Sequence, residues 1–217
     1  MASSTSFDEF GDLRLDVGES STSFLVCSRA MARSSPAFRS MLYGGFKESK
    51  PPVGKWVLKL AEENPEAFTI ILNIVHGRLD KVPLNLSNGG SDNSEHSATV
   101  LYNVAKIADK YLMIRLLRPW AESWIHPFRP RQAIDTQDYP SNFCGEIATA
   151  AWLLGEEIVL AHQLDRAVLC MRFRGMAYKG RGWITDTQRR EHRLGAMPPG
   201  PNEVLDLEGF SGTVLSP

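Results

Sequence analysis

The sequence predicts an α/β chain of the α+β kind, with a small N-terminal sheet, clustered helices and a further helical pair toward the C-terminus. Three observations predict it. Apolar and polar residues alternate in short stretches near the N-terminus, which is the pattern of half-buried strands. Apolar residues then recur every three or four positions, which is the pattern of amphipathic helices. Prolines and glycines separate these stretches and set their ends.

A hairpin is predicted first. The run "DLRLDVG" alternates apolar and charged residues and ends at Gly18, and "TSFLVCS" is its expected partner across a turn at residues 19–21. A third strand is predicted in "KWVLKLA". The alternating apolar residues of the first and third strands are Leu13, Leu15, Val17, Trp56, Leu58 and Leu60.

Several short helices follow from the positions of the prolines. Pro36 divides the helical stretch 28–43 in two, because proline lacks an amide hydrogen, and Ser34 or Ser35 is expected to cap the second part. Asn64-Pro65-Glu66 supplies a cap, a first-position proline and a first-turn acid for a helix that runs to about His76. Further helical periodicity is found in residues 101–112, 116–124, 141–154 and 158–171.

Composition divides the chain into segments. A domain over residues 10–126 is predicted, with a polar, Gly-rich and Ser-rich loop insertion at 83–97. We expect a flexible N-terminus at 1–9, a proline-rich linker at 127–140 and a helical extension at 141–173. The Gly-rich and Pro-rich residues 174–217 are predicted to be a disordered tail.

Charge and targeting signals restrict the partners. The formal net charge of -1 argues against a general attraction to nucleic acid or to anionic membrane. The residues after Met171 are rich in arginine, with Tyr178 and Trp183 interleaved, which fits RNA or DNA binding but more often marks a solvated tail. No secretion signal or membrane span is found, and three widely spaced cysteines fit reduced thiols, so we expect a location in the cytosol or nucleus.

No catalytic motif is found. The sequence has no nucleophile elbow, phosphate loop, paired Cys-x-x-Cys or His-Glu-x-x-His, and its five histidines are scattered singly, so neither an enzyme nor a cofactor or metal site is predicted. His76 and His162 are expected to be partly buried, hydrogen-bonded side chains. Trp120 and Trp124 lie one helical turn apart, and we favour core packing over a binding stripe.

Four motifs occur in one order along the chain: "SPAFRSML", "GGFKES", "NPEAFTIILNIVHG" and "LYNVAKIADKYLMIRLLRPW". Together with the order strand, strand, helix, strand, helix, long loop and two helices, they resemble the BTB (POZ) domain from about Phe10 to His126. The stretch "FLVCSRAMARSSPAF" is similar to the fungal branch of that family. The resemblance implies the BTB/POZ fold and a packed Tyr111 beside exposed Asp109 and Lys110.

The resemblance also implies a function in protein recognition. Members of this family are interaction modules without catalysis, many pair as homodimers, and one large group links substrates to cullin-3 ubiquitin ligases. That group contacts cullin-3 through a hydrophobic residue, any residue and a glutamate after the second short helix. Phe46-Lys47-Glu48 falls at that place. The alternative is a homodimerising scaffold or transcription-associated regulator without a ligase link.

The loop that carries these residues follows the double glycine Gly44-Gly45. An aromatic ring held there can enter an apolar pocket of a partner, while Glu48 adds a charged contact at the rim. The other interpretation is that Phe46 folds back on its own core and Glu48 is solvated.

A charged pocket is the second candidate site. Many family members carry a histidine and a basic residue after the second strand, where this chain has Cys27 and Ser28. Transcription-factor members dock corepressors on a pocket built with that basic residue. Asp12 and Arg29 lie close by in the sequence and are the candidates to form such a pocket here.

Overall fold

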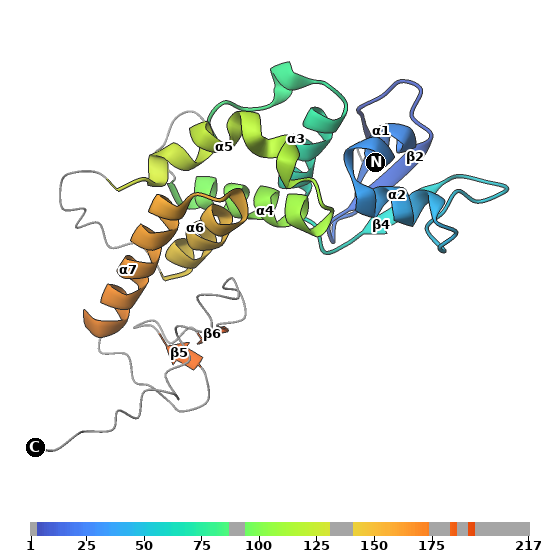
Figure 1. Ribbon diagram of the computed structural model, residues 1–217. Coiled ribbons are helices and arrows are strands. Elements are labelled where there is room, and N and C mark those ends of the chain that lie inside the picture. Colours follow the sequence, from blue (N-terminus) through green and yellow to red (C-terminus); the bar gives the residue numbers. More distant parts are fainter. Residues whose placement is uncertain (1–3, 87–93, 131–140, 174–182, 186–190, 194–217) are drawn as a thin grey trace, which may run out of the picture. The chain divides into compact units, whose positions relative to one another are not determined.

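The computed structural model describes residues 4–86, 94–130, 141–173, 183–185 and 191–193 (Figure 1). They belong to two units, Met1–Pro127 and Phe128–Pro217. The strands are β1 (Ser4–Ser6), β2 (Leu13–Val17), β3 (Thr22–Val26), β4 (Val57–Leu60), β5 (Trp183–Thr185) and β6 (Glu191–Arg193). The α-helices are α1 (Ser28–Ser34), α2 (Pro36–Tyr43), α3 (Pro65–Val75), α4 (Ser94–Lys110), α5 (Arg118–Ile125), α6 (Ser141–Leu154) and α7 (Glu157–Phe173). Short 3-10 helices are η1 (Leu79–Lys81), η2 (Ile114–Leu117) and η3 (His126–Phe128).

The first unit contains a four-stranded mixed sheet in the order β1-β3-β2-β4. β2 and β3 form the predicted antiparallel hairpin, and β4 pairs with β2 in parallel. The turn between β2 and β3 places Gly18 at φ 74° and Ser21 at φ 52°. The alternating residues Leu13, Leu15 and Leu58 are all buried. The three predicted strands are therefore confirmed.

The N-terminus differs from the expectation of a flexible segment over residues 1–9. Ser4–Ser6 forms β1, parallel to β3, and the amide of Phe7 donates to the carbonyl oxygen of Leu25 at 2.9 Å. The Phe7 side chain is buried, with its ring 5.6 Å from that of Phe24. Backbone pairing to a distant strand orders this polar segment, so the expectation is wrong for Ser4–Phe7.

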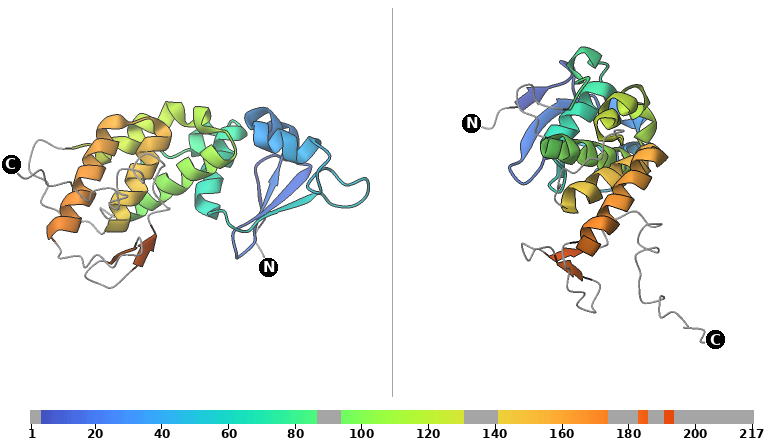
Figure 2. Two further views of the ribbon diagram at one scale, coloured as in Figure 1. Left: turned by 60° about the horizontal axis from the view of Figure 1, so that its bottom comes forward. Right: turned by 90° about the vertical axis from the view of Figure 1, so that its left-hand side faces the viewer.

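The helix boundaries follow the local capping chemistry. Ser35 caps α2, since its hydroxyl accepts from the amide of Phe38 at 2.9 Å, and Pro36 occupies the first helical position, where its missing amide hydrogen costs nothing. Asn64 caps α3 in the same way through the amide of Ala67 at 2.9 Å. α1 and α2 lie beside the sheet, and α3 packs against α4 (Figure 2).

The core of the first unit lies where these helices meet the sheet. The ring of Phe38 stacks on Tyr111 at 4.4 Å, and the ring of Phe68 meets both of them edge-on at 6.5 and 6.2 Å. Burial of aromatic area of this size contributes strongly to stability. The expected interior residues are all buried, namely Leu13, Leu15, Phe38, Phe68, Ile71 and Leu117.

The loop insertion predicted at 83–97 is shorter than expected. α4 begins at Ser94, so its polar first turn had the composition of a loop but is helical. Leu86 is buried, and the carbonyl oxygen of Pro83 accepts from the indole of Trp124 at 2.8 Å. Residues 87–93 lie outside the described residues.

The second unit contains the predicted helical pair. α6 and α7 pack side by side, and Gly155 between them takes φ 78°, which ends α6 as predicted. The ring of Phe128 lies 6.0 Å from that of Phe143, and the guanidinium of Arg129 pairs with Glu156 at 3.1 Å. These two contacts attach the first residues of the unit to its helices.

The predicted linker and tail are described only in part. Residues 127–130 include the end of η3, whereas 131–140 lie outside the described residues. Within the tail that we expected to be disordered, β5 pairs with β6 in antiparallel fashion. That local pairing is a difference from the expectation, and the remaining tail residues lie outside the described part. None of the described helices is both long and apolar enough to cross a bilayer.

Candidate partner-binding site

The double glycine after α2 is required by the path of the chain. The amide of Gly44 donates to the carbonyl oxygen of Ser40 at 2.7 Å as the last bond of the helix. A side chain on Gly44 would collide with that oxygen and lie 3.0 Å from a ring carbon of Phe46. Gly45 takes φ 78°, in the left-handed region that favours glycine. The chain thereby leaves the helix within two residues and sets the Phe46 ring over the backbone of Gly44.

Phe46 remains open to solvent on a loop that is fixed to the body of the unit. Its side chain is 60% exposed. The amide of Ser49 donates to the carbonyl oxygen of Phe46 at 3.0 Å, and the buried Trp56 donates its indole N–H to the carbonyl oxygen of Glu48 at 2.9 Å. An exposed ring held by neighbouring anchors is preorganised for contact with a partner.

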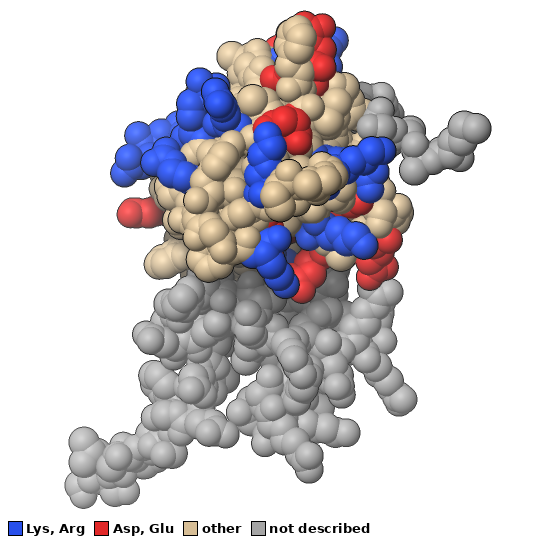
Figure 3. Space-filling view, turned by 90° about the vertical axis from the view of Figure 1, so that its right-hand side faces the viewer, with Lys and Arg blue, Asp and Glu red and all other residues tan. Residues whose placement is uncertain are grey.

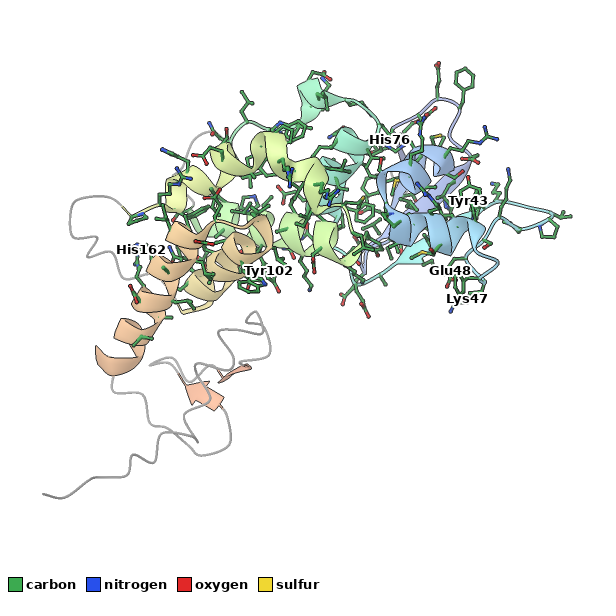
Figure 4. The ribbon with its side chains drawn as sticks, in the orientation of Figure 1. Tyr43, Lys47, Glu48, His76, Tyr102 and His162 are labelled. Carbon is green, nitrogen blue, oxygen red and sulfur yellow. The ribbon has the colours of Figure 1, made fainter. Side chains whose placement is uncertain are left out.

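The Glu48 carboxylate is less open than the ring. Its side chain is 24% exposed, and its Oε1 lies 3.6 Å from the Nζ of Lys47, whose own side chain is 92% exposed. Such an exposed pair contributes little to stability, so Glu48 can exchange Lys47 for another partner at low cost. Figure 4 shows Tyr43, Lys47 and Glu48 together near the C-terminal end of α2.

A network of hydrogen bonds joins this end of α2 to the start of α1. Asp12 accepts from the amide and the hydroxyl of Ser28, both at 2.8 Å. Because Ser28 gives its proton to Asp12, the Tyr43 hydroxyl at 2.6 Å donates to the Ser28 oxygen. The Tyr43 ring meets Trp56 edge-on at 6.0 Å, and the Nζ of Lys50 lies 3.9 Å from Asp12.

The candidate charged pocket of Asp12 and Arg29 is not joined by a direct ion pair. Asp12 turns to Ser28 and Lys50, whereas Arg29 is exposed on α1 and has no carboxylate within salt-bridge distance among the described residues. Ser28, which stands where many members have a basic residue, acts instead as a buried link between Asp12 and Tyr43. The docking role of Asp12 and Arg29 remains a prediction.

His76 has a structural role, as predicted. Its Nδ1 donates to the carbonyl oxygen of Leu72 at 2.9 Å, so its Nε2 accepts from the amide of Cys27 at 3.1 Å. Burial lowers the pKa of His76, since the charged imidazolium would lose solvation there, although the Leu72 carbonyl opposes this shift. His162 is half-buried on α7.

The segment Asp109-Lys110-Tyr111 behaves as the resemblance implied. Tyr111 is buried and donates its hydroxyl to Glu63 at 2.9 Å, while Asp109 is exposed. Lys110 is about half exposed and pairs with Glu63 at 2.6 Å. The hydrogen bond to Glu63 raises the pKa of Lys110, and burial raises the pKa of Tyr111. This cluster links the residues before α3 to the end of α4.

The two tryptophans of α5 divide between the core and the surface. Trp124 is buried, as predicted, whereas Trp120 is half-buried and stacks on it at 6.2 Å. In the described ranges, no group of three or more His, Cys, Asp or Glu side chains could hold a metal ion. Cys27 is half-buried and Cys144 is buried. The basic residues after Arg172 have side chains outside the described part.

Sequence reasoning missed the contributions of Tyr43, Trp56, Lys47 and Lys50 to the site. Tyr43 lies outside the apolar face of α2, and this position was the signal in the sequence that its ring is not part of the core. Trp56 was taken only as a strand residue, because its indole bond to a carbonyl eight residues earlier has no local pattern. The site is thus built by contacts that connect α1, α2, β4 and the loop between α2 and β4.

A family model described as "BTB/POZ domain" matches residues 2–119, which is more than half of the chain. No curated protein matches the chain. The match includes β1, which lies before the start at Phe10 that the motifs suggested. Domains of this family are protein-interaction modules, generally non-catalytic, that also mediate dimerisation. The small mixed sheet and the clustered helices of the first unit agree with the match, and the chain belongs to the BTB/POZ domain family.

Proposed function

We propose that this chain is an adaptor that binds a cullin-3 scaffold through Phe46 and Glu48. The observation that carries the proposal is the exposed ring of Phe46 on an anchored loop after α2. Binding energy at protein interfaces concentrates in a few aromatic anchors that fill a partner's pocket. Because the loop is already fixed, little conformational entropy is lost when the ring is buried.

Glu48 supplies the second contact. Its carboxylate lies beside the anchored backbone of the loop, and within the described residues its ion pair is with the exposed Lys47. Partner binding can therefore replace that ion pair with a charged hydrogen bond, which is stronger when solvent is excluded.

A pull-down with purified cullin-3 tests the proposal. Replacing Phe46 and Glu48 together by alanine should lower capture by about ten-fold or more, since it removes the anchor and its rim contact. Phe10 is the matched control, because its ring is 84% exposed on a different loop, and Phe10→Ala should leave capture unchanged. Capture of the double variant at the level of the parent would refute the cullin-3 assignment.

A self-associating scaffold is the second candidate. It is favoured by β1, which is an outer strand of the sheet, because outer strands can pair with a strand of another chain. Light scattering should then show a dimer that persists at tens of micromolar protein. A monomer throughout that range would remove this candidate and leave the cullin-3 assignment untouched.

Two finer expectations accompany the proposal. The amino-acid sequence of residues 24–38 supports membership in the fungal-type branch of the family. The cytosolic or nuclear location would be tested by imaging a fluorescently tagged chain in cells, and secretion of the tagged chain would contradict it.

A further inference from the structure

Charge is unevenly distributed in the sequence. Although the formal net charge of the chain is -1, residues 10–60 carry twice as many basic as acidic side chains. The basic residues in this range are Arg14, Arg29, Arg33, Arg39, Lys47, Lys50, Lys55 and Lys59, and the acidic ones are Asp12, Asp16, Glu19 and Glu48. A local excess of one sign creates a potential that attracts partners of the opposite sign.

The structure increases this asymmetry at the surface. Asp16 is buried and held by Ser23 at 2.7 Å and Arg14 at 3.0 Å. The Glu48 side chain is mostly covered, whereas that of Lys47 is almost fully exposed. Lys50 likewise projects further into solvent than the carboxylate of Asp12 that it approaches. The exposed charge in this region is therefore predominantly positive.

Five exposed residues follow one another along α2 and the loop after it, and we name them the basic face: Arg39, Tyr43, Phe46, Lys47 and Lys50. Arg39 is exposed one helical turn before Tyr43 on α2. The Tyr43 ring contacts Trp56, over which the Nζ of Lys50 lies at 5.9 Å. The Trp56 indole in turn holds the backbone next to Lys47.

Charged side chains are distributed over the surface of the first unit together with exposed aromatic rings. Figure 3 shows several groups of Lys and Arg side chains, with Asp and Glu side chains between some of them, separated by uncharged surface. Exposed aromatic rings lie within the same region, with Tyr43 at 51% and Phe46 at 60%. Aromatic and cationic side chains together are the composition found at protein interfaces.

We propose that the basic face binds an acidic protein segment, with Phe46 contacting an apolar residue of that segment and Lys47, Lys50 and Arg39 contacting its carboxylates. The inference rests on the proposed function only in that the loop binds a protein, and it does not require that protein to be cullin-3. Complementary charge would speed association and select the partner, while the ring contributes most of the affinity.

A single-stranded nucleic acid fits this surface less well. Bases need open aromatic faces, but the Phe46 ring lies over Gly44, and Tyr43 uses its hydroxyl on Ser28 and its ring on Trp56. Asp12 and Glu48, beside Lys50 and Lys47 of the basic face, would repel the closely spaced phosphates of a nucleic acid, whereas the carboxylates of an acidic peptide can be spaced to avoid them. The net charge of -1 also lacks the excess typical of RNA-binding proteins.

The test measures fluorescence anisotropy of a labelled peptide in which leucines stand among glutamates. The full chain should bind it, and affinity should fall about ten-fold between roughly 0.05 and 0.3 M salt, because exposed charges are screened. The same peptide with glutamine in place of every glutamate should bind at least about ten-fold more weakly.

Charge reversal identifies the surface. Lys47→Glu with Lys50→Glu should weaken peptide binding by about ten-fold or more. Lys81→Glu with Lys106→Glu is the matched control, since it changes net charge equally at exposed positions away from the face, and it should retain binding. Circular dichroism checks that both variants fold, and Lys47→Gln with Lys50→Gln should give an intermediate loss if charge is responsible.

Three results would overturn the inference: equal binding of the glutamate and glutamine peptides, equal losses in the two charge-reversed variants, or binding of labelled polyuridylate in preference to the acidic peptide. Because the assay contains no cullin-3, its result is independent of the pull-down. Failure of the unmodified chain to capture cullin-3, together with binding of the acidic peptide, would reject the cullin-3 assignment and keep the acidic-segment inference.

Discussion

Two aromatic clusters lie at opposite ends of α2 and differ in what surrounds them. Near the start of the helix, Phe38 packs with Phe68 and Tyr111, and all three rings are buried. At its other end, Tyr43 is half-exposed and Phe46 in the following loop is exposed, whereas Trp56, which meets the Tyr43 ring edge-on, is buried. The first cluster joins α2 to α3 and α4, whereas the second joins α2 to the loop that precedes β4.

The difference in burial assigns the interior cluster to stability, and we propose that the exposed rings at the other end of α2 serve recognition. Apolar area that is buried within the chain contributes to folding, but the same area left at the surface contributes only when a partner covers it. Substitution in the interior cluster should therefore be detected by unfolding, and substitution of Phe46 by binding.

The largest difference in stability is expected when one ring in each cluster is truncated. Phe38→Ala should lower the free energy of unfolding by about 3–5 kcal/mol, because it leaves a cavity among buried rings. Phe46→Ala should change it by no more than about 0.5 kcal/mol, as expected for an exposed position. Urea denaturation followed by circular dichroism measures both, and equal losses would contradict the assignment of the two rings.

The hydrogen bond from Tyr111 to Glu63 is expected to give the next largest effect on the free energy of unfolding. Tyr111→Phe removes a buried hydrogen bond to the Glu63 carboxylate and should cost about 1–3 kcal/mol at neutral pH. The pKa of Tyr111 is raised in the folded state, so the unfolded chain releases the phenol proton first as pH rises. Stability should therefore be fully present below about pH 10 and decline above it.

The raised pKa of Lys110 acts in the same direction, since the folded chain keeps that proton longer. Thermal unfolding between pH 8 and pH 11 measures the decline. Tyr111→Phe should flatten it in part and leave the contribution of Lys110. A parent whose stability does not fall above pH 10 would contradict the geometry around Glu63.

His76 is expected to make a smaller contribution to stability, which is lost as the pH falls. Its pKa is lowered on folding, so the unfolded chain binds a proton first as pH falls. The stability that depends on neutral His76 is fully present above about pH 6.5 and is lost below it, by about 1 kcal/mol for the bond to Cys27. Chemical denaturation from pH 7.5 down to pH 5 should show this slope, and His76→Gln should reduce it. An unchanged slope in His76→Gln would assign the acid sensitivity to other groups.

The sequence could predict the interior cluster because its signals are local. Alternation marked Leu13 and Leu15, helical spacing marked Phe38 and Phe68, and the side chains of Ser35 and Asn64 cap the helices that follow them. Each of these depends on neighbours within four residues. They were sufficient to predict three of the four strands of the sheet, most of the helices and a shared interior, whereas the packing of Tyr111 was implied by the family resemblance.

Non-local contacts explain what was missed. β1 has the polar sequence Ser-Thr-Ser, and only its pairing with β3 makes it a strand. The start of α4 has the composition of a loop. The exposed charge near Phe46 was also missed, because the covering of Glu48 and the projection of Lys47 depend on how Trp56 holds the loop. The candidate residues Phe46 and Glu48 could be named from a motif, but their surroundings could not.

The finest test of the comparison removes an anchor and keeps the ring. Trp56→Phe deletes the indole bond to the Glu48 carbonyl while leaving an aromatic ring against Tyr43, so global stability should fall by only about 0.5–1 kcal/mol. The loop should nevertheless open more often, because its backbone loses an attachment. Hydrogen exchange at the amide of Ser49, now bonded to Phe46, should become several-fold faster.

Trp120→Phe is the control, since it trims a half-buried indole on α5 and should leave Ser49 exchange unchanged. Unaltered exchange in Trp56→Phe would mean that the bond between Ser49 and Phe46 holds the loop alone. Faster exchange together with weaker partner binding would instead show that binding by the exposed Phe46 ring depends on the hydrogen bond made by the buried Trp56. Recognition would then be a property of how tightly the surface loop is tied to β4, and not of Phe46 alone.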